Sequence, residues 1–229
     1  MLRITFLGHS GFAVETDTKV LVFDYHVDPA HIVEAYANGP KPLWFFVSHW
    51  HQDHFNKHIA DYEASTAHYI VNKDVPLRGV TPEKLTSLSV YDTIDLGDTT
   101  VTQYGSTDEG GSFLVETEGQ SVFHAGDLNW WHWIDDTDEN NAEAKGNFDR
   151  EMKKLAGKTF DVVFFPVDAR LETAREWGVQ GFMDQVTVRT CLIPMHYFGS
   201  PWTPSQRFKK THGQTPLWIP VKSGEHTDL

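Results

Sequence analysis

The sequence LWFFVSHWHQDH at Leu43–His54 carries the strongest structural signal in the chain. Its first five residues are apolar and rich in aromatic side chains, which is typical of a strand buried on both faces. The residues that follow include four possible metal ligands, His49, His51, Asp53 and His54. Imidazole nitrogens and carboxylate oxygens are the ligands that zinc and related divalent ions prefer, and a loop held by a rigid strand can make them converge. The stretch therefore predicts a metal site at the end of a buried strand.

Two later segments repeat the pattern of an apolar strand that ends in a ligand-type residue. The segment VFHAGD ends on Asp127, and LIPMH ends on His196. Each alone is a weak signal, because single aspartates and histidines at strand ends are common. Together with the first stretch, they indicate one site assembled from three strand ends.

The remaining pattern indicates an α/β protein. We expect a β-meander over 2–7, 11–15 and 19–23, a strand over 68–72, and strands over 90–96, 99–104, 112–118 and 121–125. We expect short helical segments over 58–64 and 82–85, then helix, strand, helix and strand over 149–156, 162–165, within 174–189, and 192–195. The polar segment 135–145 is expected to be an exposed loop.

Composition restricts the class of protein. The chain has 229 residues without a flexible linker, which predicts a single domain over residues 1–229. Its 19 basic and 32 acidic residues give a net charge of −13, and no lysine- or arginine-rich run argues for a nucleic-acid partner. The single cysteine, Cys191, excludes an intramolecular disulfide. Without a signal peptide or membrane span in the pattern, we expect a cytoplasmic protein that acts on a small molecule.

The motifs together resemble a known family. The HxHxDH motif at His49–His54, the Gly126-Asp127 pair and the late Pro-Met-His at His196 are similar to the metallo-β-lactamase superfamily. The opening ITFLGHSGFAVET and the later LVFD and HAGD resemble the branch that contains ascorbate-6-phosphate lactonase and N-acyl phosphatidylethanolamine phospholipase D. The resemblance extends from about Ile4 to about Phe198 and implies a four-layer αβ/βα sandwich, with metal ions at one edge between two facing sheets.

The resemblance also implies a role for each ligand. It assigns His49 and His51 to a first metal position and Asp53, His54 and His196 to a second, with Asp127 bridging the two. Ser106 stands where the family usually has a third histidine of the first position. The first position could therefore be weak or empty, or Asp108, Glu109 or a water could replace that histidine, although the segment around these carboxylates also fits an ordinary turn.

The predicted function is hydrolysis by a water that one or two divalent ions activate, with zinc the first expectation and manganese or iron also suited. The scissile bond could be a lactone, another ester, an amide or a phosphodiester. We expect Asp53 to orient the water and His132 to be a candidate proton donor. The tryptophans near these segments could form the mouth of a pocket, although core packing is a common use of such residues: Trp50, Trp130, Trp131, Trp133 and Trp202.

Two alternatives differ in class from a hydrolase. Diiron oxygen-reducing enzymes that share the fold typically carry a glutamate where this chain has His51, and they rely on a flavin domain, so the residues argue against them. A non-catalytic metal-binding or sensor protein could keep the fold with a degraded first position. Ser106 is the main support for that second alternative.

Overall fold

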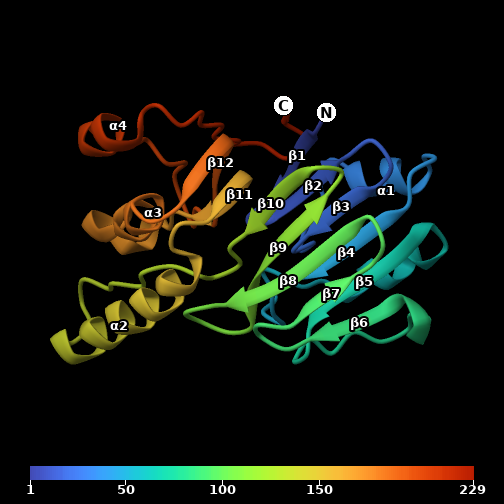
Figure 1. Ribbon diagram of the computed structural model, residues 1–229, viewed down its shortest axis with the longest axis horizontal. Helices are drawn as coiled ribbons and strands as arrows, with labels where there is room; N and C mark the ends of the chain where they lie inside the picture. Colours follow the sequence, from blue (N-terminus) through green and yellow to red (C-terminus); the bar gives the residue numbers. More distant parts are fainter.

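Two β-sheets face each other in the computed structural model, which describes residues 1–229 (Figure 1). The first sheet has the order β13-β1-β2-β3-β4-β5-β6 and contains Arg3–Gly8 (β1), Gly11–Glu15 (β2), Val20–Phe23 (β3), Leu43–Val47 (β4), Thr66–Asn72 (β5), Leu85–Leu88 (β6) and His226–Asp228 (β13). The second has the order β12-β11-β10-β9-β8-β7 and contains Thr93–Asp95 (β7), Thr99–Gly105 (β8), Gly111–Thr117 (β9), Gln120–His124 (β10), Thr159–Pro166 (β11) and Thr187–Met195 (β12).

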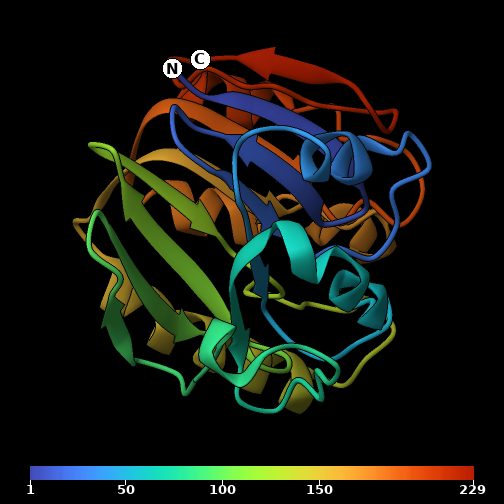
Figure 2. The same cartoon turned by 90° about the vertical axis from the view of Figure 1, so that its right-hand side faces the viewer.

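Helices cover the outer face of each sheet. The α-helices are Ile32–Ala37 (α1), Asp138–Leu155 (α2), Trp177–Met183 (α3) and Gln206–His212 (α4), and the 3-10 helices are Lys57–Ser65 (η1), Pro82–Lys84 (η2) and Ala169–Ala174 (η3). Figure 1 shows α2, α3 and α4 together beyond β10, β11 and β12. Figure 2 shows α1 and the teal η1 in front of the first sheet. The result is the predicted four-layer arrangement.

Strand β4 explains why the first sheet lies between two layers. Leu43, Phe45 and Val47 belong to the apolar cluster that also contains residues of α1 and η1, whereas Trp44 and Phe46 belong to the core between the sheets. All five side chains are buried. Successive side chains of a strand point to opposite faces, so a continuous apolar run is required at this position. The prediction of a strand buried on both faces is confirmed.

The direction of the strands determines where the candidate site lies. Strands β3 and β4 are parallel in the first sheet, and β10, β11 and β12 are parallel in the second. The carboxyl ends of parallel strands meet at the same edge of a sheet. Asp24, Ser48, Asp127, Asp168 and His196 all follow these strands directly or within three residues. The predicted β-meander of β1, β2 and β3 is also confirmed, and the two chain ends lie beside each other (Figure 1).

Several predicted elements differ from the structure. The segment 135–145 was expected to be a loop, but α2 begins at Asp138 and extends the predicted helix toward the N-terminus. The side chain of Thr137 accepts a hydrogen bond from the backbone N–H of Asn140, which caps the helix. The buried residues Phe148, Met152 and Leu155 lie three or four positions apart, so packing of one face stabilises a helix of polar composition.

The strand expected over 90–96 is only Thr93–Asp95, and β6, α1, α4 and β13 were not predicted. These elements have seven residues or fewer, and β13 pairs with β1 at the other end of the chain. No helix has the length and apolar character needed to cross a membrane.

Candidate metal centre

Seven ligand-type side chains from distant parts of the chain converge between the ends of the two sheets. One group contains His9, Asp53, His54 and His196, and we call it the second metal position. The other contains His49, His51 and Asp127, and we call it the first metal position. The structure therefore brings together all six predicted metal ligands and adds His9, which was not predicted.

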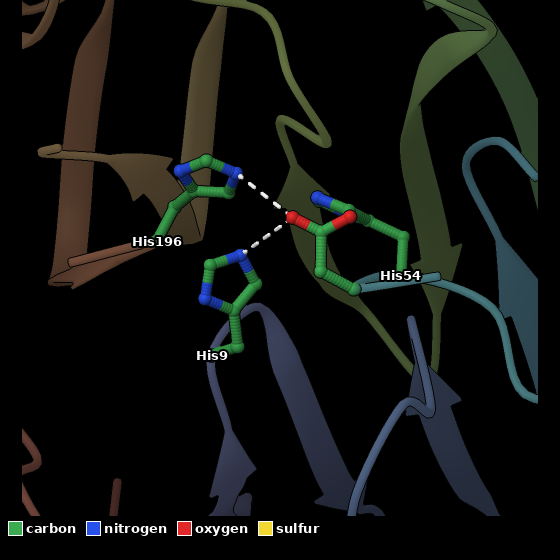
Figure 3. A group of neighbouring side chains, drawn as sticks. His9, His54 and His196 are labelled. Carbon is green, nitrogen blue, oxygen red and sulfur yellow. Dashed lines mark ion pairs between the residues drawn. The ribbon is translucent and has the colours of Figure 1, made fainter. Parts of the chain in front are cut away.

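The second metal position is built from three separate elements (Figure 3). His9 lies in the turn between β1 and β2, His54 follows β4, and His196 follows β12. Oδ2 of Asp53 lies 3.3 Å from Nε2 of His9 and 3.8 Å from Nε2 of His196. Dashed lines in Figure 3 mark these two ion pairs. His9 and His196 come from opposite ends of the chain, so only the tertiary fold creates this group.

Asp127 lies between the two positions. Its Oδ1 atom lies 3.1 Å from Nε2 of His54 and 3.3 Å from Nε2 of His196. Its Oδ2 atom lies 3.5 Å from Nε2 of His49. Each carboxylate oxygen thus faces a different set of imidazoles, which is the geometry that a bridging ligand requires.

The first metal position has only two imidazoles. Nε2 of His49 and Nδ1 of His51 lie 3.1 Å apart. Ser106 supplies no nitrogen, and its hydroxyl accepts a hydrogen bond from the backbone N–H of Asp108. Oδ2 of Asp108 lies 3.7 Å from Nδ1 of His51. A carboxylate therefore lies beside His51 of the first position.

Unpartnered polar atoms test whether these residues suit a cation. Nε2 of His9, Nε2 of His54, Nε2 of His196 and Oδ1 of Asp127 are buried and have no hydrogen-bond partner in the protein. All four belong to the ligand groups described above. Leaving buried polar atoms without a hydrogen bond costs about 1–3 kcal/mol each, so such a cluster points to a missing partner. Because the donors are imidazole nitrogens and carboxylate oxygens, divalent metal ions fit the site.

Two buried carboxylates hold the imidazoles of the second position. Oδ2 of Asp24 lies 2.7 Å from Nδ1 of His54, and Oδ2 of Asp168 lies 3.1 Å from Nδ1 of His196. Each bond fixes the imidazole tautomer and turns Nε2 toward the site, as in other carboxylate–histidine–metal arrangements. Asp24 also accepts hydrogen bonds from the backbone N–H and hydroxyl of Ser48, so the same carboxylate positions the start of the HxHxDH loop.

The backbone around the site adopts sparsely populated conformations. Positive φ angles occur at His9 (53°), Asp24 (42°), His196 (57°) and Phe198 (39°), none of which is glycine. Gly110 also has a positive φ, and a Cβ atom there would lie 2.1 Å from the carbonyl oxygen of Ser48. Residues held in such conformations cluster at functional sites. Here they bring two loops and two strand ends into one small volume.

The electrostatics of the ligands follow from their burial and mutual contacts. Burial opposes ionisation of Asp127, but the imidazoles of His54 and His196 outweigh it and hold the pKa of that carboxyl well below its ordinary value. Burial and the neighbouring His54 lower the pKa of His49 to about 4. Burial lowers the pKa of His54, but Asp127 and Asp24 outweigh it and raise that pKa well above the ordinary value. Asp127 is thus an anion and His49 is neutral at neutral pH, as metal ligands must be.

A cavity of about 440 Å³ opens over both metal positions. Besides ligands, its lining includes Thr107, Asp108, Trp131, Trp133, Asp136, Asn140, Ala144, Arg170 and Phe198. The rings of Trp131 and Trp133 are stacked with their centroids 6.0 Å apart, and Trp131 lies 5.6 Å from the ring of His196. The indole N–H of Trp131 donates to the backbone carbonyl of Asp127, which fixes this aromatic wall beside the ligands.

Comparison with known proteins agrees with this architecture. No family model matches the chain. The UPF0173 metal-dependent hydrolase of Alkaliphilus metalliredigens is 26% identical over 214 residues, covering 86% of this chain and 85% of the relative. Igni18, a metallo hydrolase of Ignicoccus hospitalis, has a TM-score of 0.66 at 15% identity, covering 99% of this chain and 97% of Igni18. YhfI of Bacillus subtilis, a metallo-β-lactamase fold protein, has a TM-score of 0.55 at 11% identity, covering 99% and 98%.

The chain has the metallo-β-lactamase fold. The predicted resemblance and the predicted α/β four-layer architecture are therefore confirmed. The relative from Alkaliphilus metalliredigens and Igni18 are both described as metal-dependent or metallo hydrolases, which agrees with the predicted class. The narrower resemblance to the ascorbate-6-phosphate lactonase branch stays a prediction. In this metallo-β-lactamase fold, the ligands lie where the ends of both sheets meet, which is where the parallel strands deliver them.

Some residues that were expected at the site or at the mouth of the pocket lie outside the cavity. The ring of His132 packs 4.5 Å from that of Trp177, and His132 does not line the cavity. Trp130 also packs on Trp177 rather than on the ligands. Trp202 is buried and donates to Glu176, outside the cavity.

Two more residues near the ligand loops also lie outside the lining. Trp50 is exposed beside His51, and Glu109 is exposed next to Asp108. Of the five tryptophans considered for the pocket, the structure therefore places only Trp131 and Trp133 in its wall.

Sequence reasoning missed the residues His9, Asp24, Asp168 and Arg170. Each follows a strand, in a turn or within the first few residues after its end. The Gly-His-Ser turn between two expected strands was a usable signal for His9, and LVFD was a signal for Asp24. Asp168 and Arg170 follow β11 in a segment without any motif, so no sequence pattern singled them out.

Proposed function

We propose that this metal-dependent hydrolase cleaves a lactone, another ester or amide, or a phosphodiester bond of a small substrate, using two divalent ions. The observation that carries the proposal is the position of Asp127, whose two oxygens face separate groups of imidazoles. Bound ions would lower the pKa of a shared water toward neutrality and polarise the oxygen of the scissile group. Zinc is the first expectation, and manganese and iron suit the same donors.

We assign the remaining tasks to residues of the chain. Asp127, His54 and His196 hold the cation site together, while Asp24 and Asp168 orient the two imidazoles. Asp53 lines the cavity beside the second position, where its Oδ2 atom lies 3.8 Å from Nε2 of His196, and it orients the attacking water. Asp108 supplies the ligand that Ser106 lacks at the first position. His132, which packs on Trp177, has no part in this proposal.

The alternative of a non-catalytic sensor rests on Ser106 alone. It gains no support from the second metal position, where four ligand-type side chains converge and two of the imidazoles are held by buried carboxylates. The open cavity over the ligands also suits a substrate rather than a closed structural ion.

Metal removal and reconstitution test the proposal. The chain would be stripped by exhaustive chelation, reloaded separately with Zn²⁺, Mn²⁺ or Fe²⁺, and assayed on parallel panels of lactones, esters, amides and phosphodiesters. We expect activity on one panel to disappear with the metal and return on reloading, with a lowered Tm in the stripped protein because the ions bind the folded chain. Activity that survives with metal content measured as zero would contradict the mechanism. One tightly held ion with no hydrolysis of any panel member would favour the sensor.

A further inference from the structure

Arg170 is the only arginine or lysine among the residues that line the cavity. It lies in η3, shortly after β11, and lines the same cavity as His51 and Asp53 of the HxHxDH loop. Its side chain is 45% exposed, whereas that of its partner Asp168 is fully buried. A cation that stays half-exposed in a cavity lined mainly by carboxylates, imidazoles and aromatic rings calls for an explanation.

The contacts of Arg170 hold one edge of the guanidinium and leave the other free. Nε and Nη2 donate to the carboxylate of Asp168, with Nη2 at 2.6 Å from Oδ2. Nη1 makes no hydrogen bond within the protein. The guanidinium carbon lies 3.7 Å from the ring centroid of Phe198 and 5.4 Å from that of Trp133. Aromatic stacking and the bidentate pair therefore fix the orientation of a group that keeps free donors.

The neighbouring carboxylates have other partners. Oδ1 of Asp136 accepts hydrogen bonds from the backbone N–H of Thr137 and from the side chain of Asn140. Asp108 and Asp53 face the ligand histidines. The nearby Arg175 offers a contrast, because its Nε and Nη2 donate to the backbone carbonyls of Val167 and Ser200 and it does not line this cavity.

We propose that Arg170 is a specificity-determining residue that binds an anionic group of the substrate, a carboxylate or a phosphate remote from the bond that is cleaved. This inference rests on the proposed function and names the substrate class. Planar guanidinium groups bind such oxyanions through paired N–H donors, and the stacked Trp131 and Trp133 beside it would contact the apolar part of the same molecule. Arg170 and the ligand His196 both contact the carboxylate of Asp168, so a single side chain separates them.

The test compares matched substrates within each protein preparation. The metal-loaded chain would be assayed on 4-nitrophenyl butyrate and 4-nitrophenyl hemisuccinate, which differ in a terminal carboxylate, and on a butyrate ester carrying a terminal phosphate. The measured quantity is the ratio of kcat/KM for the anionic ester to that for the neutral ester. Because both values come from one preparation, a change in metal content through Asp168 and His196 cancels in the ratio.

We expect Arg170→Gln to lower that ratio about tenfold, because one charge-assisted contact is lost. Arg170→Lys keeps the charge without the planar geometry and should give an intermediate ratio. Arg189→Gln is the matched control, since Arg189 is exposed, pairs with Asp161 and lies outside the cavity, so its ratio should equal that of the parent. The anion that Arg170 prefers is the one whose ester shows the larger fall in the kcat/KM ratio. An unchanged ratio in Arg170→Gln would overturn the proposal.

A direct binding measurement separates failure of this inference from failure of the proposed function. If the parent hydrolyses no panel member, the proposed function fails, and calorimetry with succinate and inorganic phosphate on the metal-loaded chain still tests Arg170. Weaker binding by about tenfold in Arg170→Gln, with Arg189→Gln unchanged, would support the anion site. Equal binding by parent and Arg170→Gln, or no binding by the parent, would overturn it.

Discussion

The two metal positions share Asp127 but differ in how the protein supports them. At the second position, His54 and His196 are buried, and each is held by a buried carboxylate. At the first position, the side chain of His51 is 31% exposed, and that of the neighbouring Asp108 is 48% exposed. Partners behind the ligands fix their geometry and raise metal affinity. His49 of the first position is buried and lies 2.9 Å from the Ser48 hydroxyl, so the difference lies in His51, which has no carboxylate behind it, and in the absence of a third imidazole.

Removing the residue that both positions share should have the largest effect. Asp127→Ala should take metal from both positions and lower kcat/KM by about 10³-fold or more, because each bound ion contributes several kcal/mol to catalysis. Metal content by mass spectrometry and hydrolysis of the active panel would measure both effects. Asp161→Ala is the control, since Asp161 is also buried but binds Ser121 away from the site. Two ions retained by Asp127→Ala would refute the bridging role.

A substitution behind the second position should separate the two affinities. Asp24→Asn removes the charge that supports His54 and should weaken metal binding at the second position by about 10–100-fold while affecting the first less. Calorimetric metal titration would resolve the two binding steps. Asp61→Asn alters a similar histidine–aspartate pair, His58–Asp61, on the surface and should leave both affinities unchanged. Equal weakening at both positions would show that Asp24 acts on the whole loop.

Restoring the missing ligand should make the two positions more alike. Ser106→His should tighten the first position by about tenfold, whereas Ser106→Ala should change little, because a hydroxyl is a poor ligand beside an imidazole. Asp108→Ala should loosen the first position and leave the second unchanged. The same titration would measure all three variants. If the parent binds two ions equally tightly and keeps both when Asp108 and Glu109 are alanine, another residue completes the first position.

The smallest expected effect leaves both metal positions intact. Trp133→Ala removes part of the cavity wall and should raise KM by about 3–10-fold with kcat within about twofold, because it weakens binding without touching the ligands. Steady-state kinetics on the active substrate would measure it. Trp202→Ala is an informative comparison, because Trp202 is buried away from the cavity and should lower Tm rather than raise KM. Insolubility of both variants would indicate that Trp133 has a core role as well.

Local sequence patterns were sufficient where one strand positions its own ligands. The apolar run over β4 required a strand buried on both faces, and the HxHxDH loop after it had to lie at that strand's end. The same reasoning located Asp127 after β10 and His196 after β12. It failed for the polar segment 135–145, because the burial of Phe148, Met152 and Leu155 against the core stabilises α2 and composition alone does not show that packing.

By itself, the sequence determined the α/β class, the strand ends that carry ligands and six of the seven residues that meet at the centre. The positions of the other residues depend on the tertiary structure. It places His9 beside His196 and sets Asp24 and Asp168 behind the ligand imidazoles. It also packs His132 on Trp177 and places Arg170 in the cavity lining. The physical reason is the range of the interactions. A buried run and the residues after it are local, but partners of a side chain are chosen by sheet order and loop geometry, which bring together residues far apart in the chain.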